Sequence, residues 1–192
     1  MSERSIVELR AIGLDRLSDL RNVHTQAFKA YLGSDLSEDQ LDALVNYANT
    51  TDYTDQMLLT ECIGAWIDDR LCATGSWMPG GDAGASAKLT AVCVHPLFGR
   101  MGLARRIVEE IENRARRAGF SVLTARCPVT MAPFLERLGY VGTSHGVWAT
   151  PCGVSVPVVH MRKGEARPDL HGTSRSTLSQ RAARLSSVAR LH

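Results

Sequence analysis

Two glycines and an alanine stand at G-x-x-G-x-A spacing at the point where an apolar run gives way to an amphipathic pattern. The stretch Val94–Arg106 reads VHPLFGRMGLARR, with Gly99, Gly102 and Ala104 as its small residues. A helix N-terminus exposes unpaired N–H groups and a partial positive charge, which together attract phosphate. Small residues let a phosphate approach the backbone, and the arginines of the stretch add formal charge. The stretch is therefore suited to bind a pyrophosphate, although the same glycines could serve only a tight turn beside solvated arginines.

Two common phosphate-binding motifs do not fit this stretch. A Walker loop requires G-K-[ST], which is absent. A dinucleotide-binding fold requires G-x-G-x-x-G and an acidic residue at the end of the next strand. Here Met101 interrupts the glycine pattern, and Arg126 ends the next expected strand.

The elements that must position this stretch follow from hydrophobic periodicity. Apolar residues recur at helical spacing from Leu14 to Tyr31, and Ser37 with Gln40 forms a capping box that opens a second helix. Strand-like runs surround the turn at Asp68-Asp69-Arg70, which predicts a hairpin. We expect helices over 14–31, 37–47, 103–118 and 132–138, and strands over 5–9, 58–67, 71–78, 89–94, 120–125, 140–144 and 156–161.

The helix expected over 103–118 has two distinct faces. Favourable i,i+4 pairs join Glu110 to Arg114 and Glu112 to Arg116, and Gly119 provides a stop. The apolar face consists of Leu103, Ile107, Val108, Ile111 and Ala115, and the polar face of Arg105, Glu109, Glu112 and Arg116. The predicted fold class is α+β, with a mixed, mostly antiparallel sheet, flanking helices and a central β-loop-α crossover between parallel strands.

Two motifs together carry a family resemblance. The pattern V-x-P-x-x-x-R-x-G-x-A follows a buried strand and opens the amphipathic helix, and F-L-E-R-L-G-Y occurs at Phe134–Tyr140. This arrangement resembles the GCN5-related N-acetyltransferase family, in element order over 5–163 and in specific motifs over 88–140. The resemblance implies binding of acetyl-CoA as co-substrate and transfer of its acetyl group to an amine.

The resemblance also implies which residues contact the co-substrate. The strand backbone at 92–94 corresponds to the segment that pairs with the pantetheine arm, and 99–104 corresponds to the pyrophosphate loop. Phe134–Tyr140 corresponds to the short helix and turn beside the thioester. The implied cofactor-binding residues are Val92, Cys93, Val94, Gly99, Arg100, Met101, Gly102, Leu103, Ala104 and Arg105.

The chain departs from the family pattern where proton transfer is concerned. Leu135 stands where many relatives carry a tyrosine that protonates the thiolate, and Pro128 stands where asparagine is common. The strand 88–91, KLTA, offers no acidic general base. Glu61 on the preceding hairpin and His145 in the last loop are the substitutes that position suggests. A positioned acid or base adds about 10²–10⁴-fold, so its absence does not exclude catalysis.

Composition and charge limit the other function classes. The 192 residues suffice for one core, and neither a secretory signal nor a bilayer-length apolar run is present, which predicts a cytoplasmic protein without a membrane partner. Five cysteines form no C-x-x-C pair and the histidines have no ligand spacing, so no metal is expected. The total formal charge is +2. From Gly164 onward, five arginines against two acids give this segment a charge of +3, which leaves −1 for residues 1–163. The body is therefore not a basic nucleic-acid-binding surface.

These observations favour an acetyl-CoA-dependent N-acetyltransferase in which an amine attacks the thioester directly in a ternary complex. The acetyltransferase domain is expected over 1–163, followed by a basic Ser/Arg-rich tail over 164–192 that is flexible or forms a docking helix. Two alternatives stay open, a non-catalytic acyl-CoA-binding regulatory domain and nucleic-acid binding through the tail. The expected partners are acetyl-CoA and an amine, with a homodimer as a further option.

Overall fold

The computed structural model describes residues 6–80 and 86–164, so the strand start expected at Ser5 and the basic tail from 165 lie outside the described residues. The strands are β1 (Val7–Ala11), β2 (Glu61–Ile67), β3 (Arg70–Pro79), β4 (Ser86–Val94), β5 (Val122–Pro128), β6 (Val141–Ala149) and β7 (Ser155–Lys163). The helices are α1 (Leu17–Tyr31), α2 (Glu38–Ala48), α3 (Thr51–Leu58), α4 (Leu103–Arg117) and α5 (Ala132–Glu136). Short 3-10 turns, η1 (Leu14–Arg16), η2 (Pro96–Phe98) and η3 (Val129–Met131), precede α1, α4 and α5.

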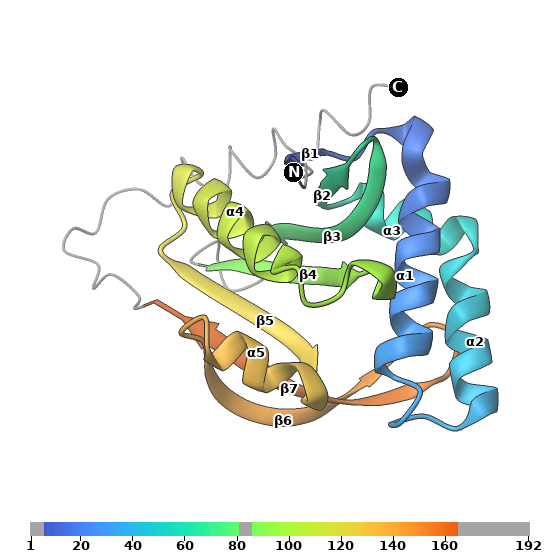
Figure 1. Ribbon diagram of the computed structural model, residues 1–192. Helices are drawn as coiled ribbons and strands as arrows, with labels where there is room; N and C mark the ends of the chain where they lie inside the picture. The colour runs from blue at the N-terminus through green and yellow to red at the C-terminus, as the bar shows by residue number, and fades with distance from the viewer. Residues whose placement is uncertain (1–5, 81–85, 165–192) are drawn as a thin grey trace.

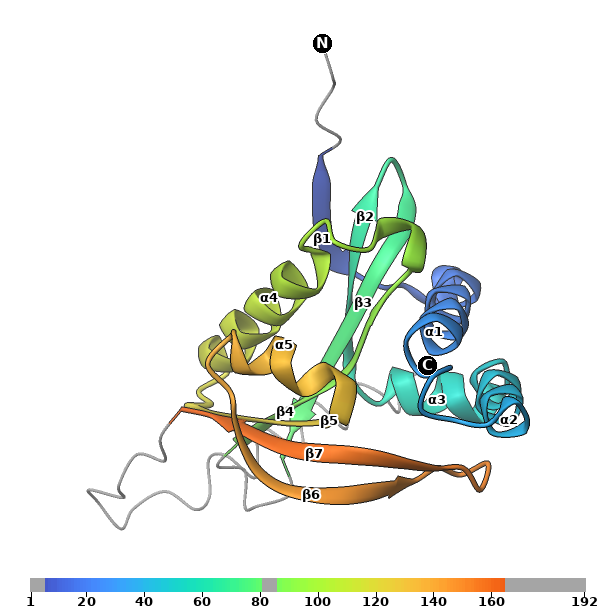
Figure 2. The same cartoon turned by 60° about the horizontal axis from the view of Figure 1, so that its bottom comes forward.

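The strands form one mixed sheet between two layers of helices. Its order is β1-β2-β3-β4-β5-β7-β6, in which only β4 and β5 are parallel neighbours. Helix α4 connects this pair as a crossover, as the sequence predicts. Figure 1 shows α4 and α5 in front of the sheet, and Figure 2 shows α1, α2 and α3 on the opposite side. The fold is the predicted mixed, mostly antiparallel sheet flanked by helices.

Helix α4 buries the face that its periodicity predicts, with one exception. The predicted apolar residues are all in the core under α4, and both i,i+4 ion pairs form. Glu112, predicted on the polar face, is only 3% exposed. Its carboxylate accepts from Lys163 Nζ at 2.8 Å and from Arg116 Nη2 at 2.7 Å. These two cations come from β7 and α4, and such pairing is what allows a carboxylate to be buried.

Helix α3 was not predicted, and it shortens the first strand of the hairpin. The Thr50 side chain caps α3 by accepting from the Tyr53 N–H at 3.3 Å. Leu58 and Leu59, interpreted from sequence as the strand start, are 41% and 73% exposed at the helix end, and β2 begins at Glu61 instead. Two adjacent leucines cannot by themselves distinguish a strand start from a helix end.

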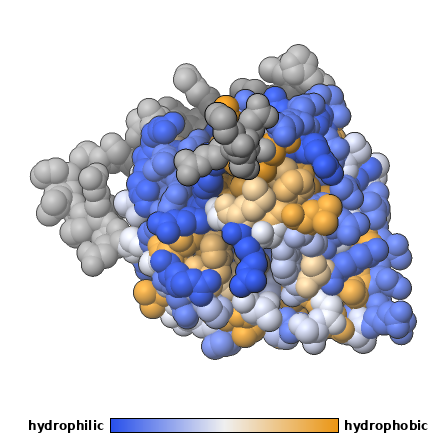
Figure 3. All heavy atoms as spheres, viewed as in Figure 1, coloured by the Kyte–Doolittle hydropathy of each residue, from blue (hydrophilic) through white to orange (hydrophobic). Residues whose placement is uncertain are grey.

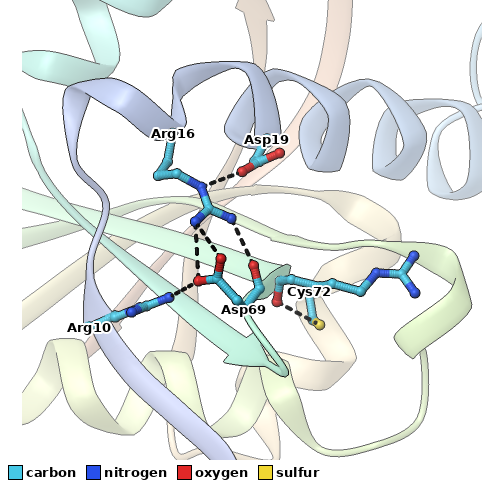
Figure 4. A network of polar contacts seen from close by, with 6 residues as sticks. Arg10, Arg16, Asp19, Asp69 and Cys72 are labelled. Carbon is cyan, nitrogen blue, oxygen red and sulfur yellow. Dashed lines mark hydrogen bonds and ion pairs between the residues drawn. The ribbon is translucent and has the colours of Figure 1, made fainter.

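Figure 4 shows a network of polar contacts that ties the first helix to the predicted hairpin turn. Asp69, in a turn where both central residues have positive φ, accepts from Arg10 at 2.6 Å and from Arg16 at 3.1 Å. These guanidinium groups lower the pKa of the Asp69 carboxyl. Both also lie 4.4 Å from the ring centre of Trp66. The network fixes β1 and the start of α1 against β2 and β3.

The surface seen from the α4 side is mostly hydrophilic around its rim. Figure 3 shows an apolar area between the positions of α4 and α1, and smaller apolar areas lie lower on the same face. Val7 and Leu9 on β1 are partly buried against the main core, so α4 does not cover the whole face of the first strands. Among the described residues, no helix is both long and apolar enough to cross a membrane.

Candidate active site

Strands β4 and β5 separate after four paired residues, and this opens the middle of the sheet. Their parallel register runs from Ser86 opposite Val122 to Leu89 opposite Ala125 and no further within the described sheet. Figure 1 shows the two strands diverging toward their C-terminal ends. The predicted segment 92–94 lies beyond the last residue pair between β4 and β5. On its opposite edge, the same segment pairs with β3. Its edge toward β5 is therefore free to pair with an extended ligand.

A tight turn connects the open end of β4 to α4. The His95 ring accepts from the Leu97 N–H at 3.3 Å and so caps η2. Arg100 and Gly102 have φ of +63° and +75°, which reverses the chain so that α4 begins at Leu103. All the residues predicted from Gly99 to Arg105 thus lie in the turn or in the first helical turn.

The N-terminus of α4 presents free backbone donors. The Arg106 N–H donates to the Gly102 carbonyl at 3.2 Å, so the N–H groups before it precede the first helical bond. A Cβ built at Gly102 meets no atom within 4 Å, which means that this position opens onto free space. The turn therefore meets the backbone requirements of a phosphate site.

The three arginines of the turn differ in how they are engaged. Arg105 pairs with Glu109 at 2.7 Å, and Arg106 donates to the Val7 carbonyl at 3.1 Å. Arg100 is exposed and forms no ion pair within the described part of the chain. Arg100 is consequently the arginine of this turn whose charge is available to an anion.

A tyrosine that the sequence analysis did not select lies beside the same turn. A Cβ built at Gly99 would be 3.5 Å from the Tyr31 hydroxyl oxygen. Tyr31 ends α1 and is 45% exposed, so its hydroxyl can reach solvent or a ligand at the loop. Tyr31 is 68 positions before Gly99 in the chain, and no local pattern links them.

The two predicted general bases lie in opposite halves of the sheet. Glu61 starts β2, and its carboxylate accepts from Arg114 of α4 at 2.7 Å. His145, expected in the last loop, instead lies on the edge strand β6, where it is exposed opposite Val159 of β7. In the strand order, five inter-strand distances separate β2 from β6. At about 4.8 Å each, they place the two strands about 24 Å apart. The two residues therefore cannot act on the same proton.

Neither Leu135 nor Cys93 supplies an acid, a base or a nucleophile at neutral pH. Leu135, in the position where many family members carry tyrosine, is 2% exposed and packs in the main core. Burial raises the pKa of the Cys93 thiol to about 12, so Cys93 remains protonated at neutral pH. Among the described residues, no group of three potential metal ligands comes together.

Two cations lie on the face of the sheet opposite α4. Lys88 and Arg126 each stand between core residues of β4 and β5, so their side chains point away from the α4 face. Burial lowers the pKa of Lys88, and the charge of Arg126 lowers it further. The Arg126 guanidinium lies 5.2 Å from the ring centre of Trp148. Neither cation forms an ion pair with another described residue.

Comparison with known proteins identifies relatives of this arrangement. A model described as the acetyltransferase (GNAT) family matches residues 19–140. No curated protein sequence matches the chain.

Several solved structures share the fold at low sequence identity. The GCN5-related N-acetyltransferase structure from Rhodopseudomonas palustris has a TM-score of 0.74 and 17% identity, covering 86% of this chain and 99% of that one. An N-acetyltransferase from Thermoplasma acidophilum in complex with coenzyme A has a TM-score of 0.59 and 16% identity, covering 83% and 99%. The YncA protein of Salmonella typhimurium, solved with its cofactor acetyl-CoA, has a TM-score of 0.59 and 18% identity, covering 87% and 100%. At these identities the likeness is one of fold.

Proposed function

Because this chain belongs to the acetyltransferase (GNAT) family and is thus an acetyl-CoA-dependent acetyltransferase, we propose that it acetylates a primary amine by direct attack on the thioester. One observation carries the proposal. The open edge of β4 leads directly into the free N–H groups of α4. An extended arm that ends in a pyrophosphate therefore finds a strand edge and an anion site in succession.

The proposed co-substrate site combines these two surfaces. The backbone of Val92, Cys93 and Val94 pairs with the pantetheine arm, and the turn from Gly99 to Arg105 binds the pyrophosphate. The free space at Gly102 fits phosphates close to the backbone, and Arg100, which has no ion pair among the residues that the structure describes, adds charge. Tyr31 is proposed as an additional donor at this loop.

The proposed reaction proceeds without a covalent enzyme intermediate. The neutral amine attacks the thioester carbonyl carbon, the C–S bond then breaks, and the amine proton leaves to a base. The high pKa of Cys93 supports direct transfer, because a protonated thiol is a poor nucleophile. The thiolate leaves without a tyrosine acid at 135, as a thiol of ordinary pKa can near neutral pH. Glu61 and His145 remain candidate bases, although the Arg114 ion pair of Glu61 supports a structural role.

The acceptor is proposed to carry an anionic group near its amine. Lys88 and Arg126 are like charges on one partly buried face, and no described acid compensates them. An acceptor anion there would relieve their repulsion as it binds. Amine pairs in which one member carries an added anionic group test this, with β-alanine against the nearly isosteric β-alaninamide as the stricter pair and phosphoethanolamine against ethanolamine as the second. We expect the anionic member to have the higher kcat/KM and Arg126→Gln to remove the difference; a preference for the neutral members would contradict the proposal.

One alternative function has a specific observation in its favour. The buried Leu135 and the lack of an acid in KLTA fit a domain that binds an acyl-CoA without turning it over. Incubation with acetyl-CoA and a broad amine panel, with free thiol as the readout, separates the two functions. Thermal stabilisation by acetyl-CoA without thiol release would favour the binding domain. Initial-rate lines that intersect when both substrates are varied would support the ternary complex.

Several organisational features remain proposals beside the activity. We propose the catalytic unit over 1–163 and a separate tail over 164–192, of which only Gly164 is described. Nucleic-acid binding through the tail predicts affinity that falls with salt and is lost on deletion of 164–192. The cytoplasmic location and the homodimer also stay predictions.

A further inference from the structure

A histidine that the proposed reaction does not use is fully buried behind β4. His24 lies on α1 with none of its surface exposed, and both ring nitrogens have partners. Nδ1 is 2.5 Å from the Tyr53 hydroxyl of α3, and Nε2 is 2.7 Å from the Thr74 hydroxyl of β3. The ring thus joins two helices to the strand that pairs with the open half of β4.

The series of hydrogen bonds from Tyr53 through His24 and Thr74 to Ala91 can point in only one direction. The Thr74 hydroxyl lies 3.3 Å from the Ala91 carbonyl, which can only accept, so Thr74 donates to it. Thr74 must then accept from His24, which places the ring proton on Nε2. The Nδ1 lone pair in turn accepts from Tyr53. Burial lowers the pKa of His24 to about 4, so the ring is neutral near pH 7 and retains this arrangement.

The chain of hydrogen bonds ends on a strained residue of β4. Ala91 has φ of +52°, a conformation that is uncommon without a glycine, and the β3–β4 register shifts at this point. Such a residue persists only where its surroundings hold it in place. Ala91 immediately precedes the segment 92–94, which is open toward β5.

We propose that His24, Tyr53 and Thr74 are positioning residues, which hold the Ala91 bulge and thereby aim the following backbone N–H groups at the thioester carbonyl of bound acetyl-CoA. This inference rests on the proposed co-substrate site. The alternative is that the three side chains only satisfy one another in the core. The two differ in one respect: a positioning role affects how the acetyl carbonyl is held, whereas core satisfaction affects only stability.

The test uses the full chain, acetyl-CoA and CoA, and needs no acceptor. Thr74→Val keeps the shape of the side chain and removes the hydroxyl, and Thr74→Ser restores a hydroxyl. Calorimetry gives the ratio of the CoA dissociation constant to that of acetyl-CoA, and the ¹³C shift of [1-¹³C]acetyl-CoA reports polarisation of its carbonyl. We expect the parent to prefer acetyl-CoA, Thr74→Val to lose about fivefold of that preference together with the carbonyl shift, and Thr74→Ser to recover both.

A matched control separates positioning from stability. Thr150 is also buried, and its hydroxyl donates to the Val154 carbonyl at 2.9 Å in the β6–β7 turn. Thr150→Val should lower the melting temperature without changing the preference or the ¹³C shift. If Thr74→Val does not fold, Tyr53→Phe replaces it, because losing the bond to Nδ1 frees the ring to change tautomer and release Thr74.

Each outcome decides the inference. A folded Thr74→Val or Tyr53→Phe protein that keeps the parent's preference and ¹³C shift overturns it. An equal loss in Thr150→Val also overturns it, because the effect then follows stability alone. A parent that binds neither CoA nor acetyl-CoA contradicts the proposed function itself, and a parent that binds both equally contradicts only the positioning role.

Discussion

The β4–α4 turn and the residues available for proton transfer are organised in opposite ways. The turn is contiguous in sequence, and it offers backbone N–H groups whose directions are set by two positive φ angles and a helix start. The candidate bases Glu61 and His145 come from β2 and β6, with four strands between them. The proposed binding site for the co-substrate thus lies in one local segment, whereas proton transfer would require side chains assembled across the sheet. A change in the turn should therefore have a much larger effect than a change in either base.

The largest expected effect comes from Gly102→Glu. The carboxylate would occupy the open space at this position and face the proposed pyrophosphate site, and each pair of like charges at about 4 Å costs about 1–4 kcal/mol. We expect no measurable heat on titration with CoA while circular dichroism remains that of the parent. Because φ at Gly102 is +75°, any side chain there also costs about 1–2 kcal/mol of stability.

Gly119→Ala is the matched control for this backbone cost. Gly119 has φ of +98° and also has no atom within 4 Å of a built Cβ, but it lies at the opposite end of α4. This variant should lose similar stability and bind CoA as the parent does. A folded Gly102→Glu protein that binds CoA normally would mean that the turn is not the pyrophosphate site.

Acidification should lower the stability of the folded chain through His24, which belongs to neither the turn nor the candidate bases. Its pKa is about 4 in the folded chain, against an ordinary value of 6.5, so the unfolded chain binds the extra proton first. Stability contributed by neutral His24 is complete above pH 6.5 and is lost as the pH falls toward 4, by about 3 kcal/mol in total. Urea unfolding of the parent and of His24→Gln at pH 7 and pH 4.5 measures this; an equal acid loss in both proteins would contradict it.

The sequence predicts local features of this molecule well, but it predicts contacts between residues far apart in the chain poorly. The amphipathic face of α4, the Ser37–Gln40 capping box and the β4-α4-β5 crossover all form as expected, because each depends on neighbours in sequence or on helical period. Burial of Glu112 was missed because its partner Lys163 is 51 positions away. The same holds for Tyr31 at the turn and for the contact of His24 with Thr74. Each of these depends on which strands and helices become neighbours, and no local spacing encodes that.

A smaller effect should separate two arginines of the turn. Arg100 has no ion pair among the described residues, whereas Arg105 is paired with Glu109. Arg100→Ala should weaken CoA binding by about 1.5–3 kcal/mol, the contribution of a hydrogen bond to a charged group, and leave the backbone donors intact. Arg105→Ala should weaken binding less. Calorimetric titration with CoA measures both losses of affinity. Equal losses would show that the ion pair with Glu109 does not reduce the contribution of Arg105 to CoA binding.

The smallest effects are expected from the two candidate bases. Glu61 is engaged by Arg114, and His145 is exposed on an edge strand, so Glu61→Gln and His145→Gln should each lower kcat/KM less than tenfold, or about 1.4 kcal/mol. An amine is mostly protonated at neutral pH, so kcat/KM should rise toward alkaline pH without a bell-shaped fall near neutrality, in the variants as in the parent. A tenfold loss in one variant, together with a changed acidic limb of its pH profile, would identify that residue as the base.

The two residues are about 24 Å apart by strand count, so the double variant should show the sum of the single effects. If both single losses are small and additive, the comparison holds, and this chain relies on positioning the thioester and on the neutral fraction of its acceptor.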